Sequence, residues 1–100
     1  MKVVLFTPEA LSDLDDIWLY IAQDSIFHAD CFVDELRDLC EGKLALFPHM
    51  GGARGYLAEG VLAFPHGSYL IYYRVRQEMV EVIRLMHGSV DVESLFATPV

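Results

Sequence analysis

The sequence predicts an α+β fold in which an N-terminal strand and a helical hairpin pack on a small, mostly antiparallel sheet. The chain has 100 residues, 54% of them hydrophobic, which suits one domain over residues 1–100 with a single main core. Apolar residues recur every three to four positions in the first half and every two in the second. Helices followed by neighbouring strands are typical of an α+β domain, here in the order β-α-α-β-β-β.

The first half predicts a strand and then a helix. Val3–Phe6 is a short β-rich run that we expect to be a buried strand. Thr7-Pro8-Glu9 has the chemistry of a helix start, with Thr as the N-cap and Pro at the first helical position. The helix should run from about Pro8 to Gln23, with Asp13 and Asp16 pointing away from the core. Its expected apolar stripe consists of Leu11, Leu14, Ile17, Trp18 and Ile21.

A second helix should follow the capping pair Asp24-Ser25 and run from about Ile26 to Phe47, because Pro48 cannot continue it. Gly42 lowers its helix propensity by up to about 1 kcal/mol relative to Ala. Its expected apolar stripe consists of Ala29, Phe32, Val33, Leu36, Leu39 and Cys40. Its expected solvent face consists of Asp30, Asp34, Arg37, Asp38 and Glu41.

The second half predicts an antiparallel meander after a glycine-rich loop at 49–55. The first strand should be Val61–Phe64, ended by Pro65-His66-Gly67. The next strands should be Tyr69–Val75 and Met79–Met86, joined by a tight connection. Residues 91–96 have the length of one helical turn.

Cysteine and histidine spacing predicts neither a disulfide nor a metal site. Cys31 and Cys40 are nine residues apart, which on one helix places them on opposite faces about 13 Å apart. We expect two buried thiols in a reducing cytoplasm. The four histidines have no ligand-like spacing to either cysteine, so no zinc and no cofactor are expected. No run of about 18 apolar residues exists to span a membrane, and the apolar N-terminal run is too short for a signal peptide.

The net charge of −8 is divided unevenly between the two halves. Residues 1–50 carry three cations against ten acids, and residues 51–100 carry four arginines against five acids, giving −7 and −1. An acidic protein repels phosphate backbones, so broad electrostatic binding to nucleic acid is not expected. A local anion site remains open if the later arginines gather on one sheet face, although each is equally compatible with a salt bridge: Arg54, Arg74, Arg76 and Arg84.

Motifs for catalysis are missing, since the chain has no GxSxG, Walker, HExxH or dinucleotide-binding pattern. We therefore expect a binding protein and not an enzyme. The most suggestive segment is Arg84–Asp91, where His87 and a glycine turn follow a strand that carries arginine. The alternative interpretation is that His87 caps the strand end and Asp91 starts the final helical turn.

The order and spacing of several motifs resemble the RelE/ParE toxin superfamily, and most of all its ParE branch. The resemblance covers about residues 3–91. It rests on Thr7-Pro8-Glu9-Ala10, Asp13–Ile17, Tyr20-Ile21, Leu46-Phe47-Pro48, Gly51 with Arg54, Tyr69–Val75 and Val82–Gly88.

The resemblance implies a bacterial type II toxin that inhibits DNA gyrase by protein–protein contact and forms a hetero-oligomer with a ParD-like antitoxin. It implies no membrane association and no sequence-specific nucleic-acid binding by the toxin alone. The RelE branch instead cuts mRNA on the ribosome, with His87 as the acid/base and Arg74 and Arg84 as phosphate clamps in this chain. No lysine follows Lys43 and the sheet half is nearly neutral, which favours the gyrase inhibitor. A non-toxic member that only binds antitoxin is the third alternative.

The resemblance also suggests residues for each partner. Arg74, Arg84, His87 and Asp91, and less strongly Arg54, are expected to contact the target. Exposed aromatics such as Tyr20 and Phe27 are expected to contact the antitoxin, unless they belong to the core.

One position departs from the family pattern, which commonly has arginine before the final aspartate. This chain has Val90 there, and valine cannot make the charged hydrogen bonds of arginine. Either this member functions without that arginine, or the residue was replaced to make a toxic protein tolerable to produce.

Overall fold

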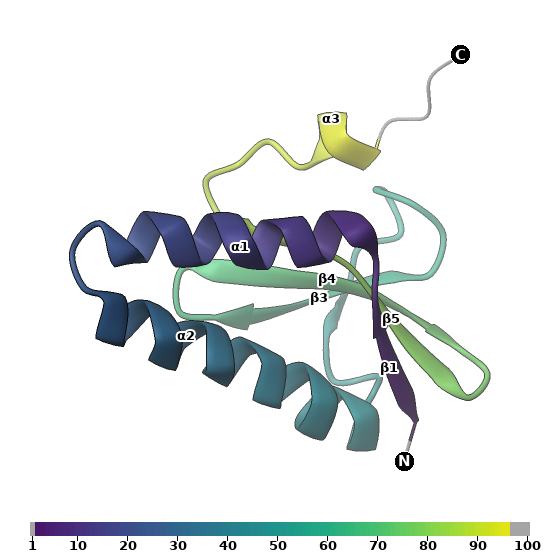
Figure 1. Ribbon diagram of the computed structural model, residues 1–100. Coiled ribbons are helices and arrows are strands. Elements are labelled where there is room, and N and C mark those ends of the chain that lie inside the picture. The colour runs from purple at the N-terminus through teal and green to yellow at the C-terminus, as the bar shows by residue number, and fades with distance from the viewer. Residues whose placement is uncertain (1, 97–100) are drawn as a thin grey trace.

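The computed structural model describes residues 2–96 and has the expected α+β architecture (Figure 1). The sheet order is β1-β5-β4-β3-β2, in which β1 runs parallel to β5 and the remaining pairs are antiparallel. The helical hairpin of α1 and α2 covers one face of the sheet. The elements are β1 (Val3–Phe6), α1 (Pro8–Ala22), α2 (Ile26–Asp38), η1 (Leu39–Leu44), β2 (Gly52–Ala53), β3 (Val61–His66), β4 (Tyr69–Arg76), β5 (Met79–His87) and α3 (Glu93–Phe96).

Both helices of the hairpin begin with the predicted caps. Thr7 Oγ1 accepts a hydrogen bond from the Ala10 N–H at 3.0 Å and donates one to the Ile83 carbonyl at 2.7 Å. Ser25 Oγ accepts from the His28 N–H at 3.1 Å. Thr7 therefore starts α1 and also fastens that start to β5.

Two predictions about the first half are wrong in detail. β1 is not buried as predicted. It is an edge strand of the sheet and only one of its faces is covered, so Val3 and Leu5 are 61% and 51% exposed. The apolar stripe of α1 is rotated toward the other flank of the helix, so Leu11 is exposed and Ala10 is buried. The rotation also buries Asp13, which we expected in solvent.

The second helix has the predicted extent, but it changes its hydrogen bonding after Asp38. The segment η1 is a π-helix that contains Gly42, and two further helical residues follow it. The predicted apolar stripe faces the core. Cys40 is buried and Cys31 is exposed, because nine positions turn them to opposite faces, so the expectation of two buried thiols is wrong; both are free.

The three predicted strands of the meander are longer than expected, β3 by two residues and β4 and β5 by one each. Pro65 does not end β3, which continues to His66 and pairs Pro65 with Leu70 of β4. The ring is tolerated there because β2 pairs only with Leu62 and Ala63, which leaves the outer edge at Pro65 without a strand neighbour. The short strand β2 lies within the segment predicted as a loop.

The two faces of the sheet support separate apolar clusters. The main core lies between the sheet and the hairpin, and a smaller cluster around Leu57, Val61 and Tyr72 lies on the opposite face. A bulge shifts the β4–β5 register, since Tyr72 pairs with Arg84 while Tyr73 pairs with Val82. Ile83 is thus the extra residue, at the point where α1 meets β5.

Candidate functional site

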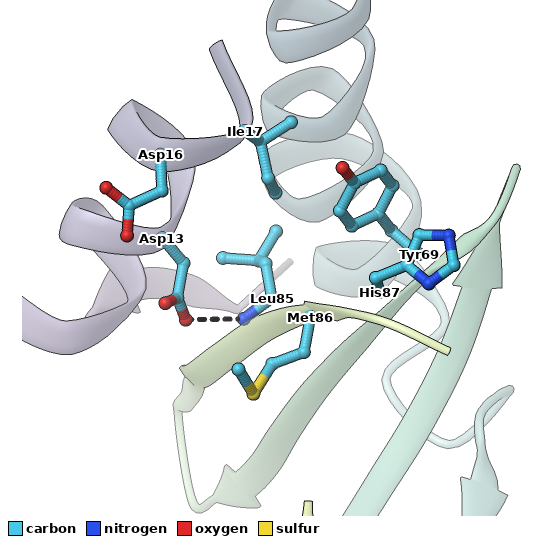
Figure 2. A pocket seen from close by; sticks show the side chains of 7 residues that line it. All are labelled: Asp13, Asp16, Ile17, Tyr69, Leu85, Met86 and His87. Carbon is cyan, nitrogen blue, oxygen red and sulfur yellow. Dashed lines mark hydrogen bonds between the residues drawn. The ribbon is translucent and has the colours of Figure 1, made fainter. Parts of the chain in front are cut away.

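A carboxylate of α1 joins that helix to β5 by three hydrogen bonds. Asp13 Oδ2 accepts from Arg84 Nε at 2.8 Å and from the Leu85 backbone N–H at 3.0 Å, and Oδ1 accepts from Arg84 Nη2 at 2.9 Å. Figure 2 shows the contact between Asp13 and the Leu85 nitrogen. The Asp13 and Arg84 side chains are 8% and 22% exposed. This geometry is a bidentate ion pair in a largely dehydrated position.

The Asp13–Arg84 ion pair lies on β5 just beyond the last residue that pairs with β1. β1 pairs with β5 only as far as Val82, because the chain turns into α1 after Phe6. Beyond that point Thr7 donates to the Ile83 carbonyl and Asp13 accepts from the Leu85 N–H. Side chains of α1 thus satisfy edge groups that a strand would otherwise bind.

A groove runs between α1 and the end of β5. It consists of two adjoining hollows of about 170 and 290 Å³ that share Tyr69 and His87. We call it the α1–β5 groove. Its lining residues are Asp13, Asp16, Ile17, Tyr69, Leu85, Met86 and His87 in the first hollow, and Tyr20 and Ser89 in addition in the second.

His87 is held by the turn that follows β5. Its Nδ1 accepts from the Ser89 N–H at 3.1 Å and lies 2.8 Å from Ser89 Oγ, which assigns the proton of the neutral ring to Nε2. The ring meets Tyr69 edge-on, with centroids 5.4 Å apart (Figure 2). One face of the groove end is therefore a pair of aromatic rings with a fixed orientation.

The electrostatics of this region are dominated by acids. The hydrogen bonding that Arg84 donates to Asp13 is the largest effect that raises the pKa of Arg84; burial opposes it, and the charges of Asp13, Glu9 and Asp16 add to it. Three carboxylates thus act on a single guanidinium. Arg84, which we predicted to contact the target, forms an ion pair with Asp13.

The other predicted arginines lie elsewhere. Arg74 and Arg76 line a hollow of about 330 Å³ together with Glu59, toward the far end of β4. Arg76 pairs with Glu81 at 3.4 Å, and Arg74 Nε is buried without a hydrogen-bond partner within residues 2–96. Arg54 Nη1 donates to the Ala53 carbonyl at 3.0 Å. The arginines therefore do not form one cluster.

The remaining predicted residues divide between the groove and the surface. Tyr20, predicted to contact antitoxin, is 68% exposed and lines the groove beside His87, which was predicted to contact the target. Phe27 is 71% exposed and packs only loosely, with its ring 5.9 Å from His28. Asp91 is exposed in the connection to α3, which begins at Glu93 and not at Asp91.

Sequence reasoning missed Asp13 and Tyr69. Asp13 lies three residues after Ala10 and four before Ile17, which is helical spacing within the buried stripe. That spacing, combined with an arginine on a late strand, is the signal that points to a buried pair. Tyr69 was noted only as part of a strand, and nothing local distinguishes it from its neighbours.

Within the part of the chain that the structure describes, no helix is both long and apolar enough to cross a bilayer. No three acidic, histidine or cysteine side chains of that part lie where they would hold a metal ion.

The structure is a small α+β domain with a groove between α1 and the end of β5. The model of the ParE toxin family, from the parDE type II toxin–antitoxin system, matches residues 4–92. The chain belongs to this family and is a ParE-type toxin of a type II toxin–antitoxin system.

Several solved structures share the fold, among them two from toxin–antitoxin systems. One is the chromosomal ParDE toxin–antitoxin system of P. aeruginosa, with 19% identity and a TM-score of 0.62 over 87% of this chain and 96% of that chain. The other is the RelBE2 toxin–antitoxin complex of Mycobacterium tuberculosis, with 20% identity and a TM-score of 0.65 over 86% and 96%. No curated protein matches the sequence.

Proposed function

We propose that this toxin inhibits DNA gyrase by protein–protein contact and is held inactive by a ParD-type antitoxin. The observation that carries the proposal is the pairing of two of the three arginines on β4 and β5 with carboxylates. Arg84 is bound by Asp13, and Arg76 is paired with Glu81. A nuclease that holds RNA needs cations directed at phosphates, and these two are directed at carboxylates instead.

His87 gives the same indication. A general acid/base must reach the proton that it transfers, and the Nδ1 of His87 is already occupied by Ser89. Only Nε2 remains for chemistry, in a groove that is also lined by Asp13 and Asp16. A role in shaping a binding surface suits this ring better than catalysis.

The proposed antitoxin contact rests on the exposed apolar surface of the hairpin. Four large apolar side chains near its turn are at least 60% exposed: Leu19, Tyr20, Ile26 and Phe27. The solved relatives are parts of toxin–antitoxin systems. Covering these side chains in a complex would remove apolar area from water, which is the main driving force for association.

The direct test incubates the purified toxin with gyrase, supercoiled plasmid and ATP. Accumulation of linear DNA after protein digestion is the expected result, because a trapped cleaved complex leaves broken strands. His87→Ala should reduce linearisation, and Arg37→Ala on the opposite flank is the matched control. Cleavage of mRNA by the toxin with unaffected gyrase would refute the proposal in favour of the ribonuclease.

Val90 offers a second test within the same assay. Its side chain is 40% exposed, and its backbone N–H donates to the His87 carbonyl at 3.0 Å. An arginine should therefore fit without altering the turn. We expect Val90→Arg to fold normally and to increase linearisation and growth arrest; equal activity of both forms contradicts a role for this position.

A further inference from the structure

The α1–β5 groove combines an apolar lining with acids from one helix. Ile17 and Leu85 form the buried floor of the groove, and Tyr20 and Tyr69 supply rings near the His87 end. Asp16 lies on the α1 side, one turn beyond Asp13 (Figure 2). Such a groove suits a long side chain that has an apolar stem and a polar end.

The net charge of the groove determines whether a cationic or an anionic side chain binds there. Asp13 is neutralised by Arg84, whereas Glu9 and Asp16 take part in none of the ion pairs found between residues 2 and 96. The charges of Asp13, Glu9 and Asp16 all act on the single guanidinium of Arg84, so the region keeps an excess negative charge. An anionic ligand would be repelled here, and a cationic one attracted.

The edge of β5 decides how a partner enters. Thr7 and Asp13 already bind the Ile83 carbonyl and the Leu85 N–H. A partner segment therefore has little backbone left to pair with at this edge and binds through side chains instead of adding a strand.

We propose that the α1–β5 groove docks an arginine or lysine side chain presented by an extended segment of the antitoxin. The proposal rests on the proposed function, because that function supplies the antitoxin as partner. The stem packs on the Tyr69 ring, Tyr20 lies one turn along α1 from Asp16, and Asp16 pairs with the charged head. The antitoxin segment that covers this toxin is thus cationic at the position that faces Asp16.

A peptide titration followed by amide NMR tests this without gyrase or antitoxin. The probes are acetyl-Leu-Arg-Leu-amide and the same peptide with citrulline, which keeps the shape of arginine and lacks its charge. We expect the arginine peptide to bind more tightly and to shift the amide signals of Ile17, Tyr69 and Ser89. Asp16→Asn should weaken that binding about fivefold, the loss of one exposed ion pair.

Asp15→Asn is the matched control, because Asp15 is exposed on the same helix and does not line the groove. It should leave the affinity unchanged. Equal binding of both peptides, an Asp16→Asn variant that binds as the natural chain does, or shifts confined to other surfaces would overturn the proposal. A toxin that passes this titration and fails to trap gyrase would refute only the proposed function.

Discussion

Removal of the Asp13 carboxylate should destabilise the attachment of α1 to β5. Asp13→Ala leaves the Arg84 guanidinium without its bidentate partner and the Leu85 N–H without an acceptor. Breaking a buried pair by removing one partner costs roughly 3–5 kcal/mol. The partial exposure of Arg84 lets water replace some of the contact, so we expect about 3 kcal/mol.

That loss is large compared with the stability of a chain of this size. A change of 1 kcal/mol shifts the melting temperature of a domain of about 100 residues by roughly 4–8 °C. Asp13→Ala should therefore lower it by about 12–24 °C. Asp13→Asn keeps one oxygen for the Leu85 N–H and loses the charge, so its effect should be smaller, at about 2 kcal/mol.

Urea unfolding followed by circular dichroism measures these differences, and hydrogen exchange locates them. The Leu85 amide should exchange much faster in Asp13→Ala, because its acceptor is gone. Asp15→Ala, an exposed change on the same helix, should stay within about 0.5 kcal/mol of the natural chain. If Asp13→Ala and Asp15→Ala unfold at the same urea concentration, or if Leu85 remains protected, the pair does not fasten α1 to β5.

Further predictions concern glycines and cysteines. Gly51→Ala should destabilise the fold by about 1–3 kcal/mol, because the added Cβ would lie 2.5 Å from the Tyr73 hydroxyl. That hydroxyl also accepts a hydrogen bond from the Gly51 N–H. Gly55→Ala, with open space around the added carbon, is the control in the same thermal melt. Gly42→Ala should raise stability by up to about 1 kcal/mol, since nothing lies within 4 Å of the added carbon, and a lower melting temperature would contradict this. Iodoacetamide should label Cys31 in the native protein and Cys40 only after unfolding, as peptide mass spectrometry can show. Burial raises the pKa of Cys40 from 9.0 to about 12. The contribution of this thiol to the unfolding free energy is therefore complete below pH 9 and is lost as the pH rises toward 12, because the thiol ionises first in the unfolded chain. A Cys40→Ala variant should lack this part of the alkaline decrease in unfolding free energy.

Local chemistry accounts for the features that were predicted correctly. Thr7 and Ser25 cap their helices through atoms only three residues away, so the sequence contains the whole interaction. The change of apolar period from helical to alternating likewise depends on neighbours along the chain. Caps, helix extents and strand positions were accessible for this reason.

Which face of α1 packs against the sheet could not be predicted from local sequence in the same way. Two apolar stripes are compatible with its sequence, one through Leu11 and Trp18 and one through Ala10 and Ile17. The choice depends on Arg84, which is 71 residues from Asp13 along the chain. The position of Asp13 and Asp16 along the groove follows from that orientation of α1. Without it, Arg84 was expected to bind a ligand and Asp13 to face solvent.

The position of β5 has a consequence for how the toxin is made. The last strand lies between the first and the fourth, and β1 pairs with it across 76 residues, from Val3 to Met79. Such long-range pairing is slow, since the chain must close a large loop before any contact compensates for the lost entropy. A nascent chain emerging from the ribosome therefore has no complete sheet until Met79–His87 is free. The groove, which β5 helps to form, arises only after Met79–His87 has been synthesised, and the first half of the chain alone does not present it.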